Sequence, residues 1–252
     1  MENASHQHSD TSLARRVEEA SLNAWPALSQ TVFDGWLLRF ARGFTKRANC
    51  VVPLYPGDGS LGLIQKVRYC ENQFAKERLK TIFRLTTLQN NAPLDQCLED
   101  RGYAHLDQSA VMTGPTRDGP VDVHLHPIDD WLAAYCELTG MPEPARSLHR
   151  LLLGAINSEC AFATLAEHGQ VRACALAVVD HKLVGLFDLV THPDYRRQGY
   201  ARRLVSSLMA WGHQRGARHA YLQVVAENQP AVALYRQLGF SELYQYWYRS
   251  ST

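Results

Sequence analysis

The feature that most limits what this chain can fold into is the stretch over residues 184–201, together with the pattern that follows it. It starts as a short apolar run with period-two character, which Pro193 ends. A basic turn at 196–198 comes next, and Gly199 precedes a helix predicted over 200–215. Apolar residues recur on one face of that helix at i, i+3 and i+4 spacing, namely Ala201, Leu204, Val205, Leu208 and Gly212. The order is therefore strand, Arg/Gly loop, helix.

The loop and the helix start together suit a bound phosphate. The first N–H groups of a helix have no intrahelical acceptor and lie at the positive end of the helix dipole, so they favour an anion. Gly199 has no side chain where a phosphate would approach the backbone. Because basic turns before helices are common, the surrounding sequence has to decide how this one is interpreted.

Two motifs in this region resemble those of the GNAT acetyltransferase superfamily. Arg196-Arg197-Gln198-Gly199-Tyr200-Ala201 is similar to motif A, Q/R-x-x-G-x-G/A, and it lies, as in the family, between a strand closely followed by proline and an amphipathic helix. The segment from Asn228 to Phe240 is similar to motif B, N-x-x-A-x-x-L-Y-x-x-x-G-F. The resemblance implies the GNAT fold, which is α/β with a mixed, mostly antiparallel sheet flanked by helices. It is strong over 121–249 and weak before that.

The chain also contains a weak internal repeat at one constant offset, without a gap. The matching positions are residues that control backbone geometry: Pro56 with Pro193, Gly62 with Gly199, Asn91 with Asn228, Pro93 with Pro230, and Gly102 with Gly239. The predicted order of elements agrees in both copies. The sequence therefore predicts two GNAT-like units in tandem: a degenerate unit over residues 1–114, a linker over 115–120, and a catalytic unit over 121–252.

The N-terminal loop at 57–62 has two interpretations. It reads G-x-G-x-x-G before a helix predicted over 63–79, which is typical of a dinucleotide site. However, the helical pattern still continues about 20 residues on, where such a site needs an acidic residue after a second strand. The internal repeat favours a degenerate GNAT loop instead, because Gly59 and Leu98 stand where the other copy has its arginine and tyrosine. We therefore expect the chemistry in the second unit.

Short strands and helices are predicted along the rest of the chain. The strands lie over 35–41, 49–54, 82–88, 121–125, 160–166, 171–179, 182–190, 220–225 and 244–248. The remaining helices lie over 13–22, 131–138, 145–156 and 230–238. The polar residues 1–10 are expected to lie outside regular structure.

Composition limits the partners and the compartment. The formal net charge of this 252-residue chain is +1, which predicts neither a nucleic-acid partner nor a membrane partner. The polar N-terminus lacks the apolar core of a signal peptide, so we expect a cytoplasmic protein, as a monomer or homodimer. The six cysteines form no C-x-x-C and the eleven histidines have no metal-ligand spacing, so free thiols and no metal are expected. There is no G-x-S-x-G hydrolase motif.

The resemblance implies acetyl-CoA as co-substrate and assigns residues to it. In the family, backbone N–H groups of the motif A loop bind the CoA pyrophosphate, which here implies Arg197, Gln198, Gly199, Tyr200 and Ala201, with Arg196 at the leading position. The family lays pantetheine along the end of the preceding strand, which here is Val190, Thr191 and His192. The motif B asparagine, Asn228, is expected to contact the pantetheine arm. Its alternative role is to start the following helix.

Two residues are predicted to be catalytic. Tyr235 matches the family's general acid, which protonates the leaving thiolate; the alternative is a tyrosine that only packs against its own helix. Asp188 lies two residues before Val190, so strand alternation puts both on one face, where a carboxylate is suited to take the proton of the acceptor amine. The rival bases are Glu143, Glu167 and Glu227.

The expected function is that of an acyl-CoA-dependent N-acyltransferase that moves an acetyl group to a primary amine by direct attack in a ternary complex. The expected acceptor is a small molecule such as an amino acid, a polyamine or an amino-antibiotic. A protein N-terminus or lysine is the alternative acceptor. The alternative class of protein is a non-catalytic acyl-CoA-binding sensor or interaction module.

Overall fold

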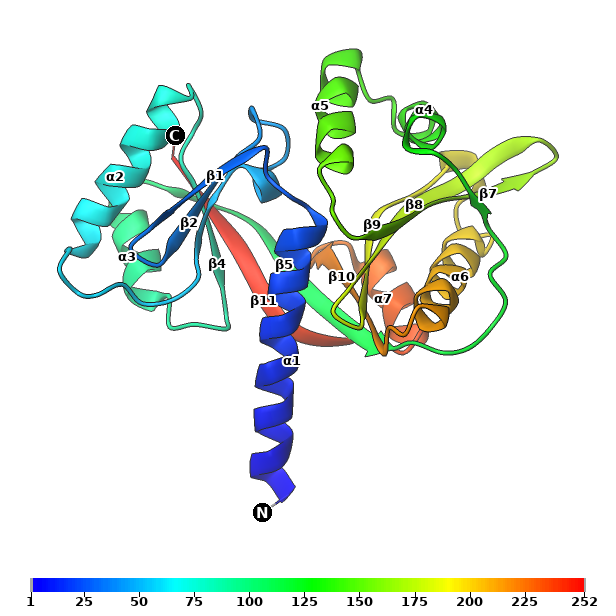
Figure 1. Ribbon diagram of the computed structural model, residues 1–252, viewed down its shortest axis with the longest axis horizontal. Helices are drawn as coiled ribbons and strands as arrows, with labels where there is room; N and C mark the ends of the chain where they lie inside the picture. Colours follow the sequence, from blue (N-terminus) through cyan, green and yellow to red (C-terminus); the bar gives the residue numbers. More distant parts are fainter. Residues whose placement is uncertain (1, 252) are drawn as a thin grey trace.

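A single mixed sheet of eleven strands runs through residues 2–251, the part of the chain that the computed structural model describes (Figure 1). The strand order is β1-β2-β3-β4-β11-β5-β10-β9-β8-β7-β6. The strands are β1 (Ser29–Phe33), β2 (Trp36–Phe40), β3 (Val51–Pro53), β4 (Ile82–Thr86), β5 (Ala104–Pro115), β6 (His124–Leu125), β7 (Glu159–Glu167), β8 (Gln170–Asp180), β9 (Leu183–Thr191), β10 (His219–Val225) and β11 (Ser241–Ser250). Only β3 with β4 and β9 with β10 are parallel in this sheet, which confirms the predicted fold class.

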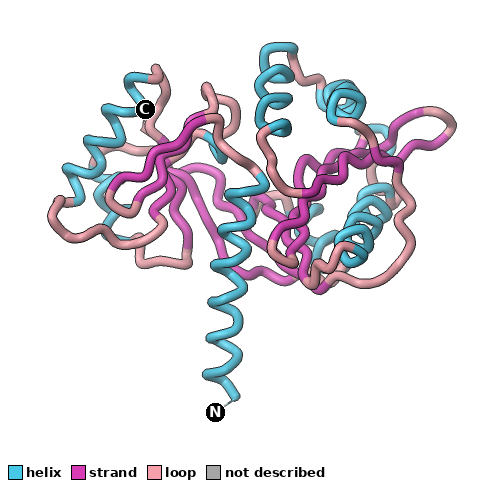
Figure 2. Tube along the Cα trace, viewed as in Figure 1, coloured by secondary structure: helices cyan, strands magenta, loops and turns pink. Residues whose placement is uncertain are grey.

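Helices cover both faces of the sheet (Figure 2). They are α1 (Glu2–Ala24), α2 (Leu63–Lys76), α3 (Ala92–Asp100), α4 (Ile128–Thr139), α5 (Glu143–Gly154), α6 (Tyr200–Gln214) and α7 (Gln229–Gln237), with short 3₁₀ turns η1 (Lys46–Ala48) and η2 (Pro193–Tyr195). One apolar cluster joins α1, α4 and α5 to one face, which we call the α1 face. Two further clusters lie on the opposite face, which we call the α6 face, under α6 with α7 and under α2 with α3.

Most predicted elements agree closely with the structure from residue 126 onward, and the main errors lie before it. The helix predicted over 13–22 begins at Glu2, so the expectation of irregular structure before it was wrong. The strand predicted over 121–125 reduces to the two residues of β6. Strands β1 and β5 were not predicted. β1 is an exposed edge strand with little apolar signal, and its hairpin to β2 turns at Asp34 and Gly35, which both have positive φ.

The apolar face predicted for α6 packs as expected. Leu204, Val205 and Leu208 are buried against the sheet on the α6 face. Gly212 allows the close approach, because a Cβ atom there would lie 2.7 Å from the side chain of Val184 on β9. The helix that follows the Arg/Gly loop is therefore fixed against the strand that precedes it.

The centre of the sheet is built from strands that pair across the two halves of the chain. β5 ends the N-terminal half, yet it pairs with β10, from Ser109 opposite Val225 to Pro115 opposite His219. β11 ends the chain, yet it pairs with β4 of the N-terminal half. β5 and β11 also pair with each other, and Figure 1 shows them side by side between the two groups of helices. The two halves thus share one continuous sheet.

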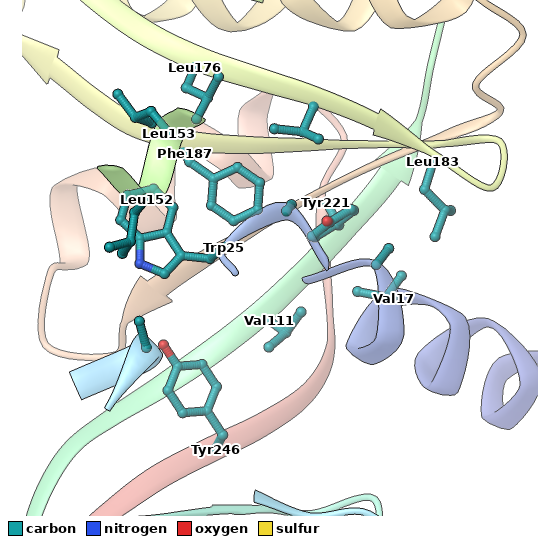
Figure 3. Close-up of a cluster of buried hydrophobic side chains, with 14 of the residues drawn as sticks. Val17, Trp25, Val111, Leu152, Leu153, Leu176, Leu183, Phe187, Tyr221 and Tyr246 are labelled. Carbon is teal, nitrogen blue, oxygen red and sulfur yellow. The ribbon is translucent and has the colours of Figure 1, made fainter. Parts of the chain in front are cut away.

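Helix α1 is tied to the α1 face by a buried ionic group. Both oxygens of Glu18 accept hydrogen bonds from Arg84 on β4, and the Tyr244 hydroxyl on β11 donates to the same carboxylate. Burial by itself would raise the pKa of Glu18, but the adjacent guanidinium outweighs it, and the pKa lies below its ordinary value of 4.5. The C-terminal end of α1 carries the chain to Trp25, which lies beside Phe187 of β9 (Figure 3).

We predict that Glu18→Ala lowers the free energy of unfolding by about 3–5 kcal/mol, because it leaves the buried Arg84 without its counter-ion. Glu19→Ala is the matched control, since Glu19 is exposed on the same helix. Because the folded pKa of Glu18 is depressed, its contribution is present above pH 4.5 and is lost as pH falls through the folded pKa. Urea unfolding at neutral and acidic pH measures the loss of stability and its dependence on pH. Equal stability of the two variants would contradict the prediction.

Candidate active site

The candidate site lies where the parallel strands β9 and β10 separate. Their pairing runs only from Leu183 opposite His219 to Leu186 opposite Leu222. Beyond these residues the strands diverge, and a cleft of about 260 Å³ opens between them. The last four residues of β9, from Asp188 to Thr191, are correspondingly half-buried, whereas the residues before them are buried. The sheet thus has an opening that residues from both faces line.

A β-bulge in β9 shapes one side of this cleft. Val190 lies opposite Cys174 and Phe187 lies opposite Leu176, so two residues of β9 face a single residue of β8. Asp188 is one of the two, and its φ of 50° lies in the left-handed region. Asp188 shares the α1 face with Val190, as alternation predicted, but the bulge also puts Phe187 on that face. Alternation alone does not describe this part of the strand.

The predicted phosphate loop lies between η2 and α6 and is open to solvent. Residues 196–199 are exposed. Gly199 has a φ of 88°, a conformation that favours glycine, and nothing lies within 4 Å of the position of its missing Cβ. It precedes the first turn of α6, whose N–H groups have no acceptor within the helix. The geometry agrees with an anion site formed by the loop and the helix start.

The end of β9 next to this loop is more constrained than the sequence suggested. The backbone N–H of His192 donates to the carbonyl of Arg172 on β8, at 2.8 Å, and is not free for a ligand. The His192 ring accepts a hydrogen bond from the backbone of Asp194 and so caps η2. Val190 and Thr191 are half-buried and pair with β8.

The α6 side of the cleft is lined by the motif B residues. The Oδ1 atom of Asn228 accepts from the backbone N–H of Ala231 at 3.3 Å, so this side chain starts α7, the alternative that the sequence left open. Asn228 also lines the cleft. Tyr235, seven residues further along the chain on α7, also lines the cleft. Burial raises the pKa of Tyr235 to about 12, so the phenol keeps its proton at neutral pH.

On the α1 side, Asp188 is bound to a histidine that sequence reasoning missed. The Nε2 atom of His149 on α5 lies 2.9 Å from the Asp188 carboxylate. His149 is only 1% exposed, and the rings that surround it belong to Trp25, Phe44, Trp131 and Tyr135. Its Nδ1 atom has no hydrogen-bond partner among the described residues. The dyad holds the carboxylate at the edge of the cleft.

Two further residues line the cleft without any sequence signal. Arg47 belongs to η1 in the N-terminal half, and Gln223 belongs to β10. The Tyr246 hydroxyl of β11 donates to the Gln223 side chain at 3.3 Å and also contacts the Arg47 guanidinium. Arg47 is far from both motifs in the sequence, and only the shared sheet brings it to this site.

The rival bases do not line the cleft. Glu143 is exposed on α5 and accepts from the Ser147 hydroxyl, and Glu167 accepts from the Tyr200 hydroxyl beside the phosphate loop. Glu227 is exposed in the turn before α7. In the described part of the chain, Asp188 is the carboxylate that lines the cleft.

The matching loop of the N-terminal half is closed by its own side chains. The backbone N–H of Asp58 donates to the Asp34 carboxylate, that of Ser60 to the Asp58 carboxylate, and that of Gly62 to Gln65. Gly62 has a φ of −69°, a conformation open to any residue, unlike Gly199 in the other loop. Carboxylates therefore stand where a phosphate would have to bind.

The described residues hold little that suggests other classes of site. No group of three or more His, Cys, Asp or Glu in this part of the chain is arranged to hold a metal ion. All six cysteines are free. Among residues 2–251, none of the helices has the length and apolar character needed to cross a bilayer.

Comparisons with known proteins agree with the geometry. A family model described as "Probable histone acetyltransferase Rv0428c C-terminal" matches residues 11–249. "Uncharacterized N-acetyltransferase YobR" of Bacillus subtilis is 25% identical over 248 residues, which cover 93% of this chain and 97% of that protein. "Probable histone acetyltransferase Rv0428c" of Mycobacterium tuberculosis is 28% identical over 232 residues, which cover 91% of this chain and 71% of that protein. The solved structure of a GCN5-related N-acetyltransferase from Kribbella flavida has a similar fold, with a TM-score of 0.68, 16% identity, and coverage of 94% and 95%.

We predict that Gly199→Glu weakens acetyl-CoA binding by roughly 100-fold, because it adds a carboxylate where the phosphates are expected. Gly199→Ala is the control for backbone strain, which costs about 1–2 kcal/mol for a side chain in the left-handed region. It should weaken binding less than the glutamate does. Calorimetric titration measures both affinities. An unchanged affinity of the Gly199→Glu variant would show that the phosphates bind elsewhere.

Proposed function

The chain belongs to the GNAT superfamily of N-acetyltransferases, within the family matched over residues 11–249, and on this basis we propose that it transfers the acetyl group of acetyl-CoA to the primary amine of a small molecule. The observation that carries the proposal is the cleft between β9 and β10, which is lined by Tyr235 from the α6 side and by Asp188 from the α1 side. An acid and a base thus lie on opposite sides of one opening in the sheet. This arrangement suits direct attack in a ternary complex, because the amine and the thioester can meet in the opening from opposite sides.

The residues on the α6 side fit a CoA thioester. The phosphate loop presents unpaired N–H groups and the exposed Arg196 and Arg197, which suit a diphosphate. The cleft begins beside this helix and continues past Asn228 to Tyr235. We therefore assign the pyrophosphate to the loop and the pantetheine arm to the cleft, with the amide of Asn228 available to it alongside its capping role.

The proposed chemistry is one acyl transfer with two proton movements. The acceptor nitrogen forms a bond to the thioester carbon, the carbon–sulfur bond breaks, and the acetyl amide and the free thiol leave. Asp188 takes the proton that the amine has to lose, and His149 holds its carboxylate toward the cleft. Tyr235 donates its proton to the departing sulfur. Because the pKa of this phenol is raised, the proton is still present when it is needed. Unpaired N–H groups at the bulge of β9 are suited to polarise the carbonyl.

A small acceptor is favoured by what covers the α1 side. Trp25 and Arg47 come from the N-terminal half and lie against Phe187, so side chains of that half narrow the cleft on this side. The alternative acceptor is an amine of a protein. The Mycobacterium tuberculosis relative is named as a probable histone acetyltransferase, which is an enzyme of that kind. A panel of small amines and of peptides, followed by release of free thiol from acetyl-CoA, separates the two. Acetylation of peptides alone would exclude the small-molecule acceptor.

We extend the proposal to the whole chain as two GNAT-like units with one active site. In the N-terminal half, β3 and β4 are parallel and register at a single pair, Val51 opposite Phe83, and α2 and α3 follow them as α6 and α7 follow β9 and β10. This repeat of the plan supports the division at residues 115–120. The closed loop at 57–62 supports a degenerate role for the first unit.

We predict that Tyr235→Phe lowers kcat by about 10²–10⁴-fold, because the ring remains and the proton is lost. Since the pKa of Tyr235 is about 12, the loss should be similar at every pH from 6 to 9, roughly the working range, without a change in the shape of the profile. The affinity for acetyl-CoA is the internal control and should stay within a few-fold. A single-turnover rate constant equal to that of the wild type would exclude the acid role.

Asp188→Asn tests the proposed base in the same assay. A single-turnover rate constant equal to that of the wild type would exclude the base role.

We predict one acetyl-CoA per chain. The loop before α2 already satisfies N–H groups with Asp34 and Asp58, and the exposed carboxylate of Asp58 repels a diphosphate. Binding should therefore be lost with Gly199→Glu and retained with Ser60→Glu, which adds the same charge to the other loop. Calorimetry gives the stoichiometry. Two molecules per chain, or binding that only the Ser60 variant abolishes, would reverse the roles of the two units.

A further inference from the structure

The cleft contains a cation that the proposed acetyl transfer does not use. Arg47 lines it together with Asp188 and Gln223. It comes from η1, in the N-terminal half of the chain, and approaches from the α1 side, where an acceptor would enter. The backbone carbonyl of Arg47 is held by the side chain of Arg39, so the turn that carries it is fixed.

Several buried cations of this protein have a carboxylate partner, whereas Arg47 has none among the described residues. Arg84 is paired with Glu18, Arg249 with Asp95, and Lys66 with Asp34. Arg39 and Arg172 also lack a carboxylate, but the guanidinium of Arg39 donates to three backbone carbonyls and that of Arg172 to the Gln170 side chain.

Arg47 forms no ion pair with a described residue. Its Nε atom is buried without a hydrogen-bond partner in the described part of the chain, but so are those of Arg39, Arg84 and Arg172, so it is the missing acceptor beside the cleft that distinguishes Arg47. Withdrawing a guanidinium from water is costly unless its donors are satisfied, so an unpaired one beside a cleft indicates that a ligand supplies the acceptor.

The surroundings of Arg47 hold it in place without neutralising it. Its guanidinium carbon lies 5.5 Å from the centre of the Trp25 ring and 5.9 Å from that of Phe187. These ring faces and the Tyr246 hydroxyl fix the orientation of the side chain but carry no negative charge. The carboxylate of Asp188 is close enough to act on the charge of Arg47, but its hydrogen bond is with His149. The fork of N–H groups is thus oriented and available.

We propose that Arg47 binds a carboxylate of the acceptor, so that the substrate is an amine that also carries a carboxylate, as a free amino acid does. This rests on the proposed function, because it places the ammonium group at Asp188 and the carboxylate at Arg47. The two charges of such a zwitterion then face the two opposite charges that line the cleft. A planar carboxylate matches the guanidinium fork with two parallel hydrogen bonds.

Two sources of this chemistry have to be distinguished. A free amino acid offers its own α-carboxylate next to the amine. A short peptide offers one at its C-terminus or on an acidic side chain near its N-terminus. Both present an amine and a carboxylate within one small molecule, and both fit the same pair of charges.

The test compares matched acceptors in the full-length enzyme. Amino acids are assayed against their carboxamides, which keep the amine and the side chain and lose the charge. Peptides with an acidic second residue are assayed against the corresponding amides. We expect kcat/KM to favour the carboxylate form by roughly 10- to 100-fold, the range typical of a charge-assisted bidentate contact. The pair that shows the larger ratio identifies the source.

Variants of η1 then assign the preference to one side chain. Arg47→Met should reduce the carboxylate-to-carboxamide ratio toward one, and Arg47→Lys, which keeps the charge without the fork, should retain part of it. Lys46→Met is the matched control, because Lys46 belongs to the same turn but pairs with Asp107 at the surface. It should leave the ratio unchanged. Thermal unfolding checks that each variant is folded.

Several outcomes would overturn the inference. One is that the wild-type enzyme acetylates amino acids and their carboxamides equally well. This test does not depend on the folding of any variant. Another is an Arg47→Met variant that loses activity on both acceptors by the same factor, which would assign Arg47 to the thioester or to the fold. If no amine at all is acetylated although acetyl-CoA binds, the proposed function fails, and that result is distinct from a missing carboxylate preference.

Discussion

The antiparallel pairing of β5 with β11 at the centre of the sheet is the interaction on which the rest of the structure depends. Each of these strands ends one half of the chain and pairs with a strand of the other half, β5 with β10 and β11 with β4. The hydrogen bonds of one sheet therefore join both halves. This brings η1 and the end of α1, both from the N-terminal half, against the strands that form the cleft. The active site that we propose is consequently built by the whole chain.

The second constraint is that β9 and β10 are parallel but pair over only a few residues. Parallel neighbours that diverge leave backbone groups and side chains of both strands exposed to the gap between them. The bulge at Asp188 further disrupts the regular course of β9 at this point. The opening connects two environments. One contains a helix start, exposed arginines and Tyr235, and the other contains the His149–Asp188 dyad and Arg47. Tyr235 and Asp188, the proton donor and acceptor that we propose, therefore line the same opening from opposite faces of the sheet.

The two loops that precede α2 and α6 show how one backbone plan can serve different purposes. Before α6, Gly199 adopts a left-handed conformation and residues 196–199 are exposed. Before α2, carboxylates of the protein itself accept the corresponding hydrogen bonds. The difference is one of charge and hydrogen-bond supply rather than of topology. It explains how a unit can keep the order of elements and still lack the means to hold a diphosphate.

The sequence by itself determined what depends on neighbouring residues. The 3.6-residue period, Gly199 and the Asn-x-Pro start predicted α6, α7 and the loop between β9 and α6, and with them Asn228 and Tyr235, because capping, turn and periodicity are local effects. The tertiary structure decided what depends on distant partners. β5 is a strand because β10 and β11 flank it, the bulge at Asp188 arises from its register with β8, and His149 and Arg47 reach the cleft only through packing. No local pattern encodes such contacts, because the interactions that fix them exist only after the sheet has assembled.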